Sequence, residues 1–186
     1  VIISLLNLQS KDIEDKQVLE LFKESRERIR AMALLHEKVY ECKNLSRINF
    51  RDYISRVVEN LLSTYSLKPG QVQLKIEIEE MVLDIKTSVP LGLIINELVS
   101  NSLKYAFPGS RKGYLQVHLE SCEGEGGKDN YALIVSDNGV GFPEDQDFRN
   151  SKTLGMRLVD ALVKQIHGDI ELDRKAGTSF TIKFEM

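Results

Sequence analysis

Apolar residues in the first 45 positions recur at helical spacing. Residues 2–8 have the pattern of the last turns of a helix that ends near Gln9, and Asp12 is expected to cap a second helix. Seven positions of this second helix alternate at spacings of four and three and predict an apolar seam: Val18, Phe22, Ser25, Ile29, Met32, His36 and Val39. The charged residues between them predict a solvated face. Residues 1–45 are therefore expected to form a helical hairpin whose seam packs on another hairpin.

From residue 46 onward, helical and alternating patterns follow one another. Helical spacing predicts helices over three segments: 51–66, 91–106 and 154–167. Pro90 is expected near the start of the second helix, and Gly168 is expected to end the third. Alternation predicts six strands, at 72–78, 81–85, 114–120, 131–136, 169–173 and 179–185. The Gly-rich stretch 124–130 is expected to be an exposed turn. The pattern predicts an α+β fold, with three helices covering a mixed, mostly antiparallel sheet.

Composition narrows the possible classes of protein. Hydrophobic residues make up 42% of the 186 positions, which is enough for a packed core. The 25 basic and 28 acidic residues give a net charge of −3, which argues against nucleic acid as a partner. The apolar runs are shorter than the roughly 20 residues that span a bilayer, so we expect no membrane contact. Cys42 and Cys122 form no CxxC motif, which excludes a disulfide framework or zinc ribbon.

Polar residues form a stripe on the expected helix 91–106. Glu97, Asn101, Lys104 and Tyr105 fall on one face of an otherwise apolar element. A carboxylate could orient a water or hydroxyl, an amide oxygen could bind Mg²⁺ held mainly by phosphates, and an ammonium could neutralise phosphate. A helix with one solvated side would show the same stripe, so the pattern alone leaves both interpretations open.

A second candidate follows the expected strand 131–136, in the sequence Asp137-Asn138-Gly139-Val140-Gly141. An Asp buried at the end of an apolar strand needs a hydrogen-bond donor, and the amino group of adenine is one that fits. Gly139 and Gly141 allow the backbone to bend and to approach a ligand closely. The alternative is a simple hairpin turn, which is less favoured because no matching strand follows directly.

Two further patches lie near the C-terminus. Gly155, Met156 and Arg157 open the expected helix 154–167, where free backbone N–H groups attract phosphate, although ordinary helix capping would explain the glycine as well. Gly177 and Thr178 form a tight turn into the last strand, which a hairpin alone would also require.

Together and in this order, the four patches resemble the nucleotide-binding boxes of the Bergerat-fold (GHKL) ATPases, which include sensor histidine kinases, gyrase, heat-shock chaperones and MutL. The segments VIISLLNLQS, RIRAMALLHEKVY and PLGLIINELVSNSLKYAFP resemble histidine kinases with a variant dimerisation hairpin. The resemblance implies a two-layer α/β sandwich preceded by a helical hairpin. Residues 1–45 would be part of the dimerisation and phosphotransfer hairpin, and residues 46–186 the ATP-binding catalytic domain.

The resemblance also implies roles for individual residues. Asp137 would accept the adenine amino proton, helped by a water near Gly141 and Thr178, and Gly139 belongs to the same box. Asn101 would ligate a Mg²⁺ ion that bridges the ATP phosphates. Glu97 stands where the ATPase branches keep a catalytic general base.

Other positions are implied to contact ATP. Lys104 would lie near the phosphates, Tyr105 against the nucleotide, and Gly155, Met156 and Arg157 under the phosphates. Residues 143–153 would form a short lid over ATP. The box at 154–157 departs from the glycine-rich pattern of many kinases because it keeps a single glycine.

The implied function is transfer of the ATP γ-phosphoryl group to a histidine and then to an aspartate of a response-regulator receiver domain. The full-length protein would be a cytoplasmic or membrane-anchored homodimer. The chain begins inside an apolar periodic segment without Met, so we expect a piece of a longer protein whose acceptor histidine precedes Val1. His36, followed by Glu37, is the alternative acceptor within the chain, although it falls on the seam.

Two other functions remain open at this point. The chain could be a GHKL-type ATPase or an anti-sigma-type serine kinase that uses Glu97 as its base. It could also be a nucleotide-binding dimerisation module without catalysis. The helical hairpin argues against the first alternative, and Asn101, Asp137 and Gly141 argue against the second.

Overall fold

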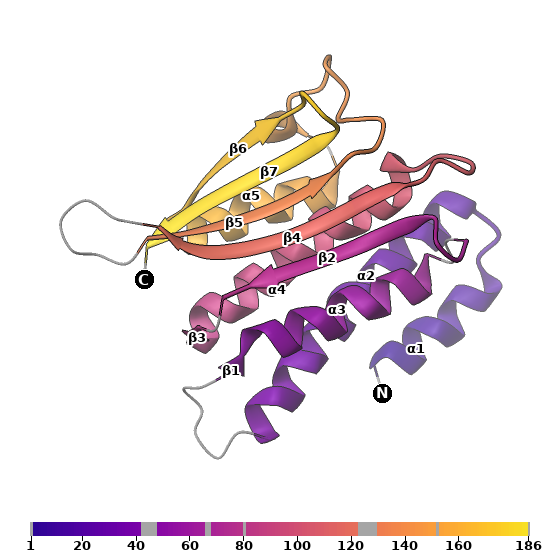
Figure 1. The fold of residues 1–186 in the computed structure, drawn as a ribbon. Coiled ribbons are helices and arrows are strands. Elements are labelled where there is room, and N and C mark those ends of the chain that lie inside the picture. Colours follow the sequence, from indigo (N-terminus) through magenta and orange to yellow (C-terminus); the bar gives the residue numbers. More distant parts are fainter. Residues whose placement is uncertain are drawn as a thin grey trace.

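A five-stranded sheet forms one layer of the molecule and helices form the other (Figure 1). The computed structural model describes residues 2–41, 48–65, 68–79, 81–122, 130–151 and 153–185. The strands lie in the order β2 (Val72–Ile78), β4 (Gly113–Cys122), β5 (Asn130–Asp137), β7 (Thr178–Glu185) and β6 (Asp169–Asp173). β2 and β4 are parallel and the other pairs antiparallel. The predicted mixed, mostly antiparallel sheet is confirmed.

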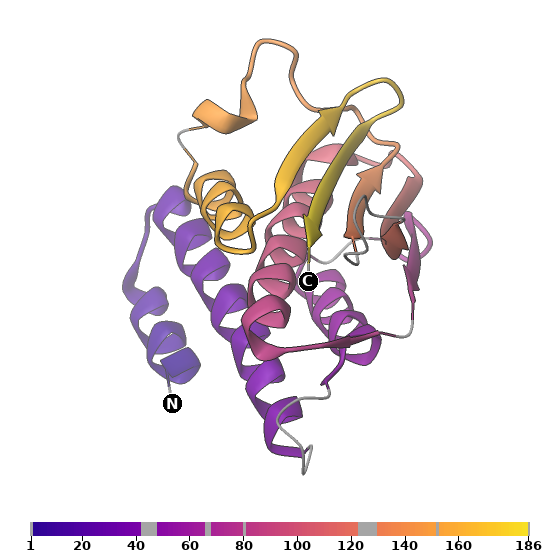
Figure 2. The same ribbon diagram turned by 90° about the vertical axis from the view of Figure 1, so that its left-hand side faces the viewer.

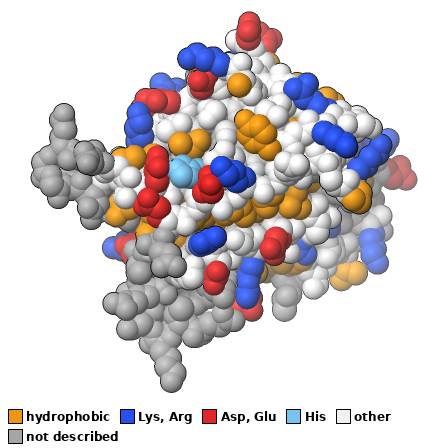
Figure 3. Space-filling view, viewed as in Figure 1, with side chains coloured by type: hydrophobic (Ala, Val, Ile, Leu, Met, Phe, Trp, Pro, Cys, Tyr) orange, Lys and Arg blue, Asp and Glu red, His pale blue; other side chains and the backbone are white. Residues whose placement is uncertain are grey.

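Three helices cover one face of this sheet: α3 (Phe50–Thr64), α4 (Ile85–Asn101) and α5 (Leu154–Gln165). Every residue of α4 from Pro90 to Ser100 is buried, so α4 is the central element of the helical layer. The strands alternate as expected, since Leu115 and Leu119 of β4 are buried while the solvent side of the sheet carries charged side chains (Figure 3).

The N-terminal hairpin consists of α1 (Ile2–Gln9), a 3₁₀ turn (η1, Ser10–Asp12) and α2 (Lys16–Glu41) (Figure 2). The helix α2 packs against both α3 and α4, whereas α1 contacts α2. Ile2, Leu5 and Leu8 of α1 are exposed. No helix in the described residues is long and apolar enough to cross a membrane.

The predicted cap of α2 is wrong. Asp12 lies in the 3₁₀ turn, three residues before the helix begins at Lys16. Asp15 instead accepts hydrogen bonds from the backbone N–H groups of Gln17 and Val18, at 2.7 and 3.4 Å. An aspartate caps a helix only from the position directly before it, because its side chain must reach the first free N–H groups.

The prediction that the charged residues of α2 face solvent is also wrong for part of the helix. Glu27 and Arg28 are buried, together with Ala31 and Leu35. These residues form the stripe that faces α3 and α4, and Tyr53 of α3 donates a hydrogen bond to the carbonyl of Ala31 (3.2 Å). On the predicted seam, by contrast, Met32 and His36 are exposed.

The segment before α4 differs from the expected strand 81–85. Only Val82–Leu83 is extended, as β3, and it pairs with β1 (Ile48–Asn49) in a separate two-stranded sheet. The side chain of Asp84 accepts from the N–H of Thr87 (2.8 Å), so α4 begins at Ile85. Pro90 therefore lies inside the helix and not at its start, because the Asp84 cap sets the boundary earlier.

The ends of two helices also differ from the prediction. A π-helical turn, η2 (Ser102–Ala106), continues α4 where a regular helix was expected. The helix α5 ends at Gln165, and His167 takes the left-handed conformation (φ 53°) one residue before Gly168, which was expected to end the helix. Gly168 is needed there for space, since a Cβ would lie 2.7 Å from the carbonyl of Lys183. The expected turn 124–130, except Asn130, and Cys42 lie outside the described residues.

Candidate nucleotide-binding site

A pocket of about 420 Å³ lies between α4, η2, α5 and the ends of β5 and β7. Its size suits a small-molecule ligand, and its wall combines apolar with polar side chains. Eight residues singled out from the sequence line it: Glu97, Asn101, Tyr105, Asp137, Gly141, Gly155, Met156 and Thr178. Segments that are far apart in the chain therefore meet at one cavity, in the way the four patches imply.

Asp137 lies at one end of this pocket, as the last residue of β5. Its side chain is buried, with the residue 4% exposed. Ser102 donates its hydroxyl to Oδ2 at 2.6 Å, and the backbone N–H of Gly139 donates to Oδ1 at 2.9 Å. Among the described residues, no cationic side chain forms an ion pair with Asp137. Each oxygen can accept a further hydrogen bond, so the carboxylate can receive a donor from a ligand.

Glycines bring the backbone close around Asp137. Gly177 has a φ of 116°, and a Cβ there would lie 2.0 Å from the carbonyl oxygen of Asp137. Gly141 has a φ of 86°, and a Cβ there would lie 3.4 Å from the carbonyl of Gly177. Both positions need the left-handed conformation that glycine adopts readily. Thr178 pairs with Asp137 across β5 and β7 and lines the pocket beside it.

Gly139 supports the site from behind and does not line the pocket. A Cβ at Gly139 would lie 2.4 Å from the carbonyl of Ala106, so the loop after β5 packs directly on η2. Arg111 donates to the carbonyls of Asn138 and Gly139, at 3.1 and 3.0 Å, and holds the loop from outside. Nothing in the sequence around Arg111 indicated this contact.

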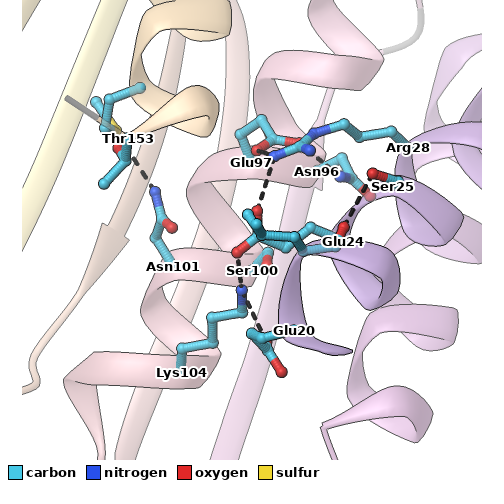
Figure 4. A network of polar contacts seen from close by, with 12 residues as sticks. Glu20, Glu24, Ser25, Arg28, Asn96, Glu97, Ser100, Asn101, Lys104 and Thr153 are labelled. Carbon is cyan, nitrogen blue, oxygen red and sulfur yellow. Dashed lines mark hydrogen bonds and ion pairs between the residues drawn. The ribbon is translucent and has the colours of Figure 1, made fainter. Parts of the chain in front are cut away.

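Glu97 lies at the opposite end and is held by α2. Arg28 donates from Nε to Oε1 (2.8 Å) and from Nη2 to Oε2 (2.7 Å), which makes a bidentate, buried ion pair (Figure 4). Asn96 adds a hydrogen bond at 3.1 Å. Burial lowers the pKa of Arg28, but the hydrogen bonds and charge of Glu97 outweigh it and hold that pKa above its ordinary value. Both oxygens of Glu97 are therefore engaged by a cation.

Lys104 contacts α2 instead of the pocket. Its Nζ lies 2.6 Å from Glu24 and 2.9 Å from Glu20, with its side chain 7% exposed (Figure 4). Burial lowers the pKa of Lys104, but the hydrogen bonds that it donates to these two glutamates raise it more, so the pKa lies above its usual value. Glu24 itself lines the pocket and also contacts Arg28 (3.2 Å). The sequence interpretation missed Glu24 and Arg28 because both fall in a charge run typical of solvated helix faces.

The start of α5 forms the remaining wall. Gly155 is buried against Glu97, where a Cβ would lie 2.6 Å from Oε2. Asn101 donates from Nδ2 to the sulfur of Met156 (3.4 Å), which leaves its amide oxygen as a group of the kind that Mg²⁺ takes. Tyr105 is exposed at the rim, and Arg157 is exposed and does not line the pocket.

The described residues contain no cluster of three or more His, Cys, Asp or Glu side chains that could hold a metal ion. A Mg²⁺ ion at this pocket would therefore depend on Asn101, ligand phosphates and water, which is a usual arrangement for that ion. Asn101 by itself supplies too few ligands for Mg²⁺. The site therefore fits the predicted metal only when a bound ligand adds phosphate oxygens.

The pocket combines a buried carboxylate, paired with neutral donors, with a helix N-terminus in its wall, and these features suit a ligand that carries both a hydrogen-bond donor and phosphate. Residues 86–186 match the family of histidine kinase-, DNA gyrase B- and HSP90-like ATPases, and residues 1–65 match a family described as histidine kinase. The chain belongs to the first of these families, whose model matches more than half of it.

Curated relatives agree with this assignment. The chain is 26% identical over 117 residues to blue-light-activated histidine kinase 2 of Erythrobacter litoralis, covering 63% of this chain and 32% of that protein. It is 24% identical over 185 residues to the sensor histidine kinase PdtaS of Mycobacterium tuberculosis, covering 97% of this chain and 35% of PdtaS. The chain thus spans about a third of the length of these relatives.

Solved structures share the fold. The histidine kinase domain of the Erythrobacter litoralis EL346 blue-light-activated kinase superposes with a TM-score of 0.78 at 24% identity, covering 98% of this chain and 83% of that one. The histidine kinase AdeS of Acinetobacter baumannii gives a TM-score of 0.60 at 18% identity, covering 100% of this chain and 93% of that one. At these identities the likeness confirms the predicted architecture alone.

Proposed function

We propose that this chain binds Mg-ATP between Asp137 and Asn101 and supplies the γ-phosphoryl group to a histidine, from which a response-regulator aspartate receives it. The observation that carries the proposal is the buried carboxylate of Asp137, which accepts from two neutral donors and keeps a free acceptor position on each oxygen. The amino group of adenine is a donor of the required kind. Residues 1–45 would serve the phosphotransfer hairpin and residues 46–186 the ATP-binding part.

The other pocket residues would act by binding and positioning. Asp137 would orient the base, and the apolar walls of Phe142, Met156 and Phe180 would exclude water around it. The N-terminus of α5, at Gly155, would favour the negative charge of the phosphates. Mg²⁺, when bound, would neutralise phosphate charge beside the amide oxygen of Asn101. Little further protein chemistry is needed, because phosphoryl transfer depends mainly on positioning and charge.

The partners and the place of the reaction follow from the same proposal. A phosphorelay of this class needs a receiver domain as partner, and dimerisation of the full-length protein would bring two hairpins together, in the cytoplasm where ATP is available. His36, exposed on α2, is the alternative acceptor within the chain. Glu97 as a hydrolytic base is disfavoured, since Arg28 engages both of its oxygens.

Calorimetric titration with Mg-ATP and Mg-ADP tests the binding step. We expect the chain to bind both nucleotides and Asp137→Asn to bind at least about 30-fold more weakly, because a charge-assisted hydrogen bond is lost and an amide N–H₂ faces the base amino group. Asp173→Asn is the matched control, since Asp173 also ends a strand but is exposed. The proposal fails if the unaltered chain binds neither nucleotide, or if both variants weaken binding equally.

Labelling with γ-labelled ATP tests the transfer step in the full-length protein. We expect an acid-labile phosphoryl group, as on histidine, that persists in His36→Gln and disappears in Asp137→Asn. Acid-stable label would instead support the serine kinase, and ATP hydrolysis without labelling would support the ATPase. ATP binding without labelling or hydrolysis would support the nucleotide-binding dimerisation module without catalysis.

A further inference from the structure

Successive residues at the end of α4 and the start of η2 line the pocket: Ser100, Asn101 and Ser102, with Tyr105 and Ala106 one turn later. The backbone at Asn101 and Ser102 is regular helix, with φ of −62° and −61°, so α4 itself directs these side chains. Ser102 is the residue of this wall that contacts Asp137.

Ser102 directs its hydroxyl at the ligand-accepting group of the pocket. The residue is 8% exposed, and its Oγ lies 2.6 Å from Oδ2 of Asp137. A carboxylate only accepts, so the hydroxyl proton must lie between these two oxygens. The N–H of Gly139 holds the other oxygen at 2.9 Å. With one donor on each oxygen, the plane of the carboxylate is fixed from both ends.

The orientation matters because the last torsion of an aspartate side chain is otherwise broad. With Gly139 alone, the carboxylate could turn about the single remaining hydrogen bond. With Ser102 in place, the unused lone pairs keep one direction and can accept a hydrogen bond from a fixed position in the pocket. A site that is built to receive a donor discriminates strongly against a ligand that lacks one.

We propose that Ser102 is a positioning residue for base selection, which holds Asp137 so that the carboxylate accepts the amino group of a 6-aminopurine. This inference rests on the proposed binding of ATP at the pocket. It predicts that Ser102 contributes to affinity only through the amino group of the base, and that its contribution disappears for a purine nucleotide without that group.

Two ligands and three variants test this inference by calorimetry. The ligands are ADP and purine riboside diphosphate, in which hydrogen replaces the 6-amino group. We expect the unaltered chain to prefer ADP, Ser102→Ala to lose about tenfold of this preference, and Ser102→Cys, whose thiol is a weaker donor, to lie between them. Ser88→Ala is the matched control, because Ser88 is a buried serine like Ser102 but lies on α4 and does not line the pocket.

The outcomes separate this inference from the proposed function. If the unaltered chain binds neither ligand, ATP binding itself is wrong. If it binds ADP but Ser102→Ala weakens both ligands by the same factor, Ser102 has only a structural role and the inference is overturned. If Ser102→Ala does not fold, Ser102→Cys decides, since an unchanged preference with the weaker donor also overturns it. A smaller preference in either variant, with Ser88→Ala unchanged, supports it.

Discussion

The two buried carboxylates of the pocket are held in opposite ways. Asp137 accepts from a hydroxyl and a backbone N–H, both neutral, so its negative charge is not cancelled. Glu97 accepts two hydrogen bonds from the guanidinium of Arg28, so its charge is cancelled by a cation from another helix. Burial is similar at the two sites, with 4% of Asp137 and 5% of Glu97 exposed. The chemistry of the partner, and not the burial, distinguishes them.

This difference separates a group that can accept a ligand donor from a group that holds the structure together. A carboxylate held by neutral donors keeps its capacity for a ligand donor. A carboxylate in a bidentate ion pair has little capacity left and mainly links two elements, here α2 and α4. The pocket thus has one end suited to recognition and one end that couples it to the N-terminal hairpin.

The largest expected effect comes from removing the cation at the Glu97 end. Arg28→Met leaves the carboxylate of Glu97 buried without its partner, and we expect the free energy of unfolding to fall by about 3–5 kcal/mol. Adding Glu97→Gln removes the unpaired charge and should recover part of this loss. Urea denaturation of the single and double variants measures both values.

The matched control for this prediction is Lys164→Met on α5. Lys164 contacts Asp160 at 2.7 Å, with the two side chains 73% and 31% exposed, so its loss should lower the free energy of unfolding by less than about 1 kcal/mol. Equal losses for Arg28→Met and Lys164→Met would contradict the comparison, because the buried pair would then contribute no more than an exposed one. So would a double variant that is less stable than Arg28→Met alone.

We expect Lys104→Met to lower the free energy of unfolding by about 1–2 kcal/mol at neutral pH. This loss is smaller than for Arg28→Met because Glu24 keeps Arg28 as a partner. The folded-state pKa of Lys104 is raised above its ordinary value of 10.5. Its contribution is therefore fully present below pH 10.5 and is lost as the pH rises through the folded-state pKa.

Urea denaturation at pH 7 and at successively higher alkaline pH, on the unaltered chain and Lys104→Met, measures this dependence. The stability difference between the two proteins should stay constant up to pH 10.5 and then shrink. A difference that grows with alkaline pH would place Lys104 outside the ion pairs with α2.

The smallest effect is expected at Ser88, whose buried hydroxyl has no hydrogen-bond partner among the described residues. Ser88→Ala removes a desolvated polar group without breaking a contact, so stability should stay unchanged or rise by up to about 1 kcal/mol. Thermal unfolding checks this value. A clear loss of stability would show that the hydroxyl of Ser88 has a partner after all, and Ser88→Ala would then need replacing as a control for Ser102.

Much of the site could be predicted because its residues have local signals. Asp137 follows an apolar strand and precedes two glycines, and Asn101 and Glu97 interrupt an apolar helix, so each stands out against its neighbours. Strand β2 matches the predicted range 72–78, since alternation with one solvated face is a strong signal. Features with a regular local pattern were therefore found from the sequence alone.

The features that were missed depend on contacts between distant segments. Arg28 has the same local surroundings as the exposed charges beside it, and only the position of Glu97 on α4 makes it buried. Lys104 belongs to the same polar stripe as Asn101, but its ammonium forms ion pairs with two glutamates of α2 and does not line the pocket. The π turn at Ser102 has no sequence signal, because it depends on packing against β5 and its following loop.

The complete burial of α4 has a consequence for how the protein can change by mutation. A helix with a solvated side can vary there without affecting the fold, but between Pro90 and Ser100 no such side exists. Substitutions at Glu97, Leu98 and Ser100, which are buried and also line the pocket, are therefore expected to alter stability and ligand affinity together. In the exposed residues of segment 143–151, the two properties can vary independently, so new ligand preferences can arise there at little risk to the fold.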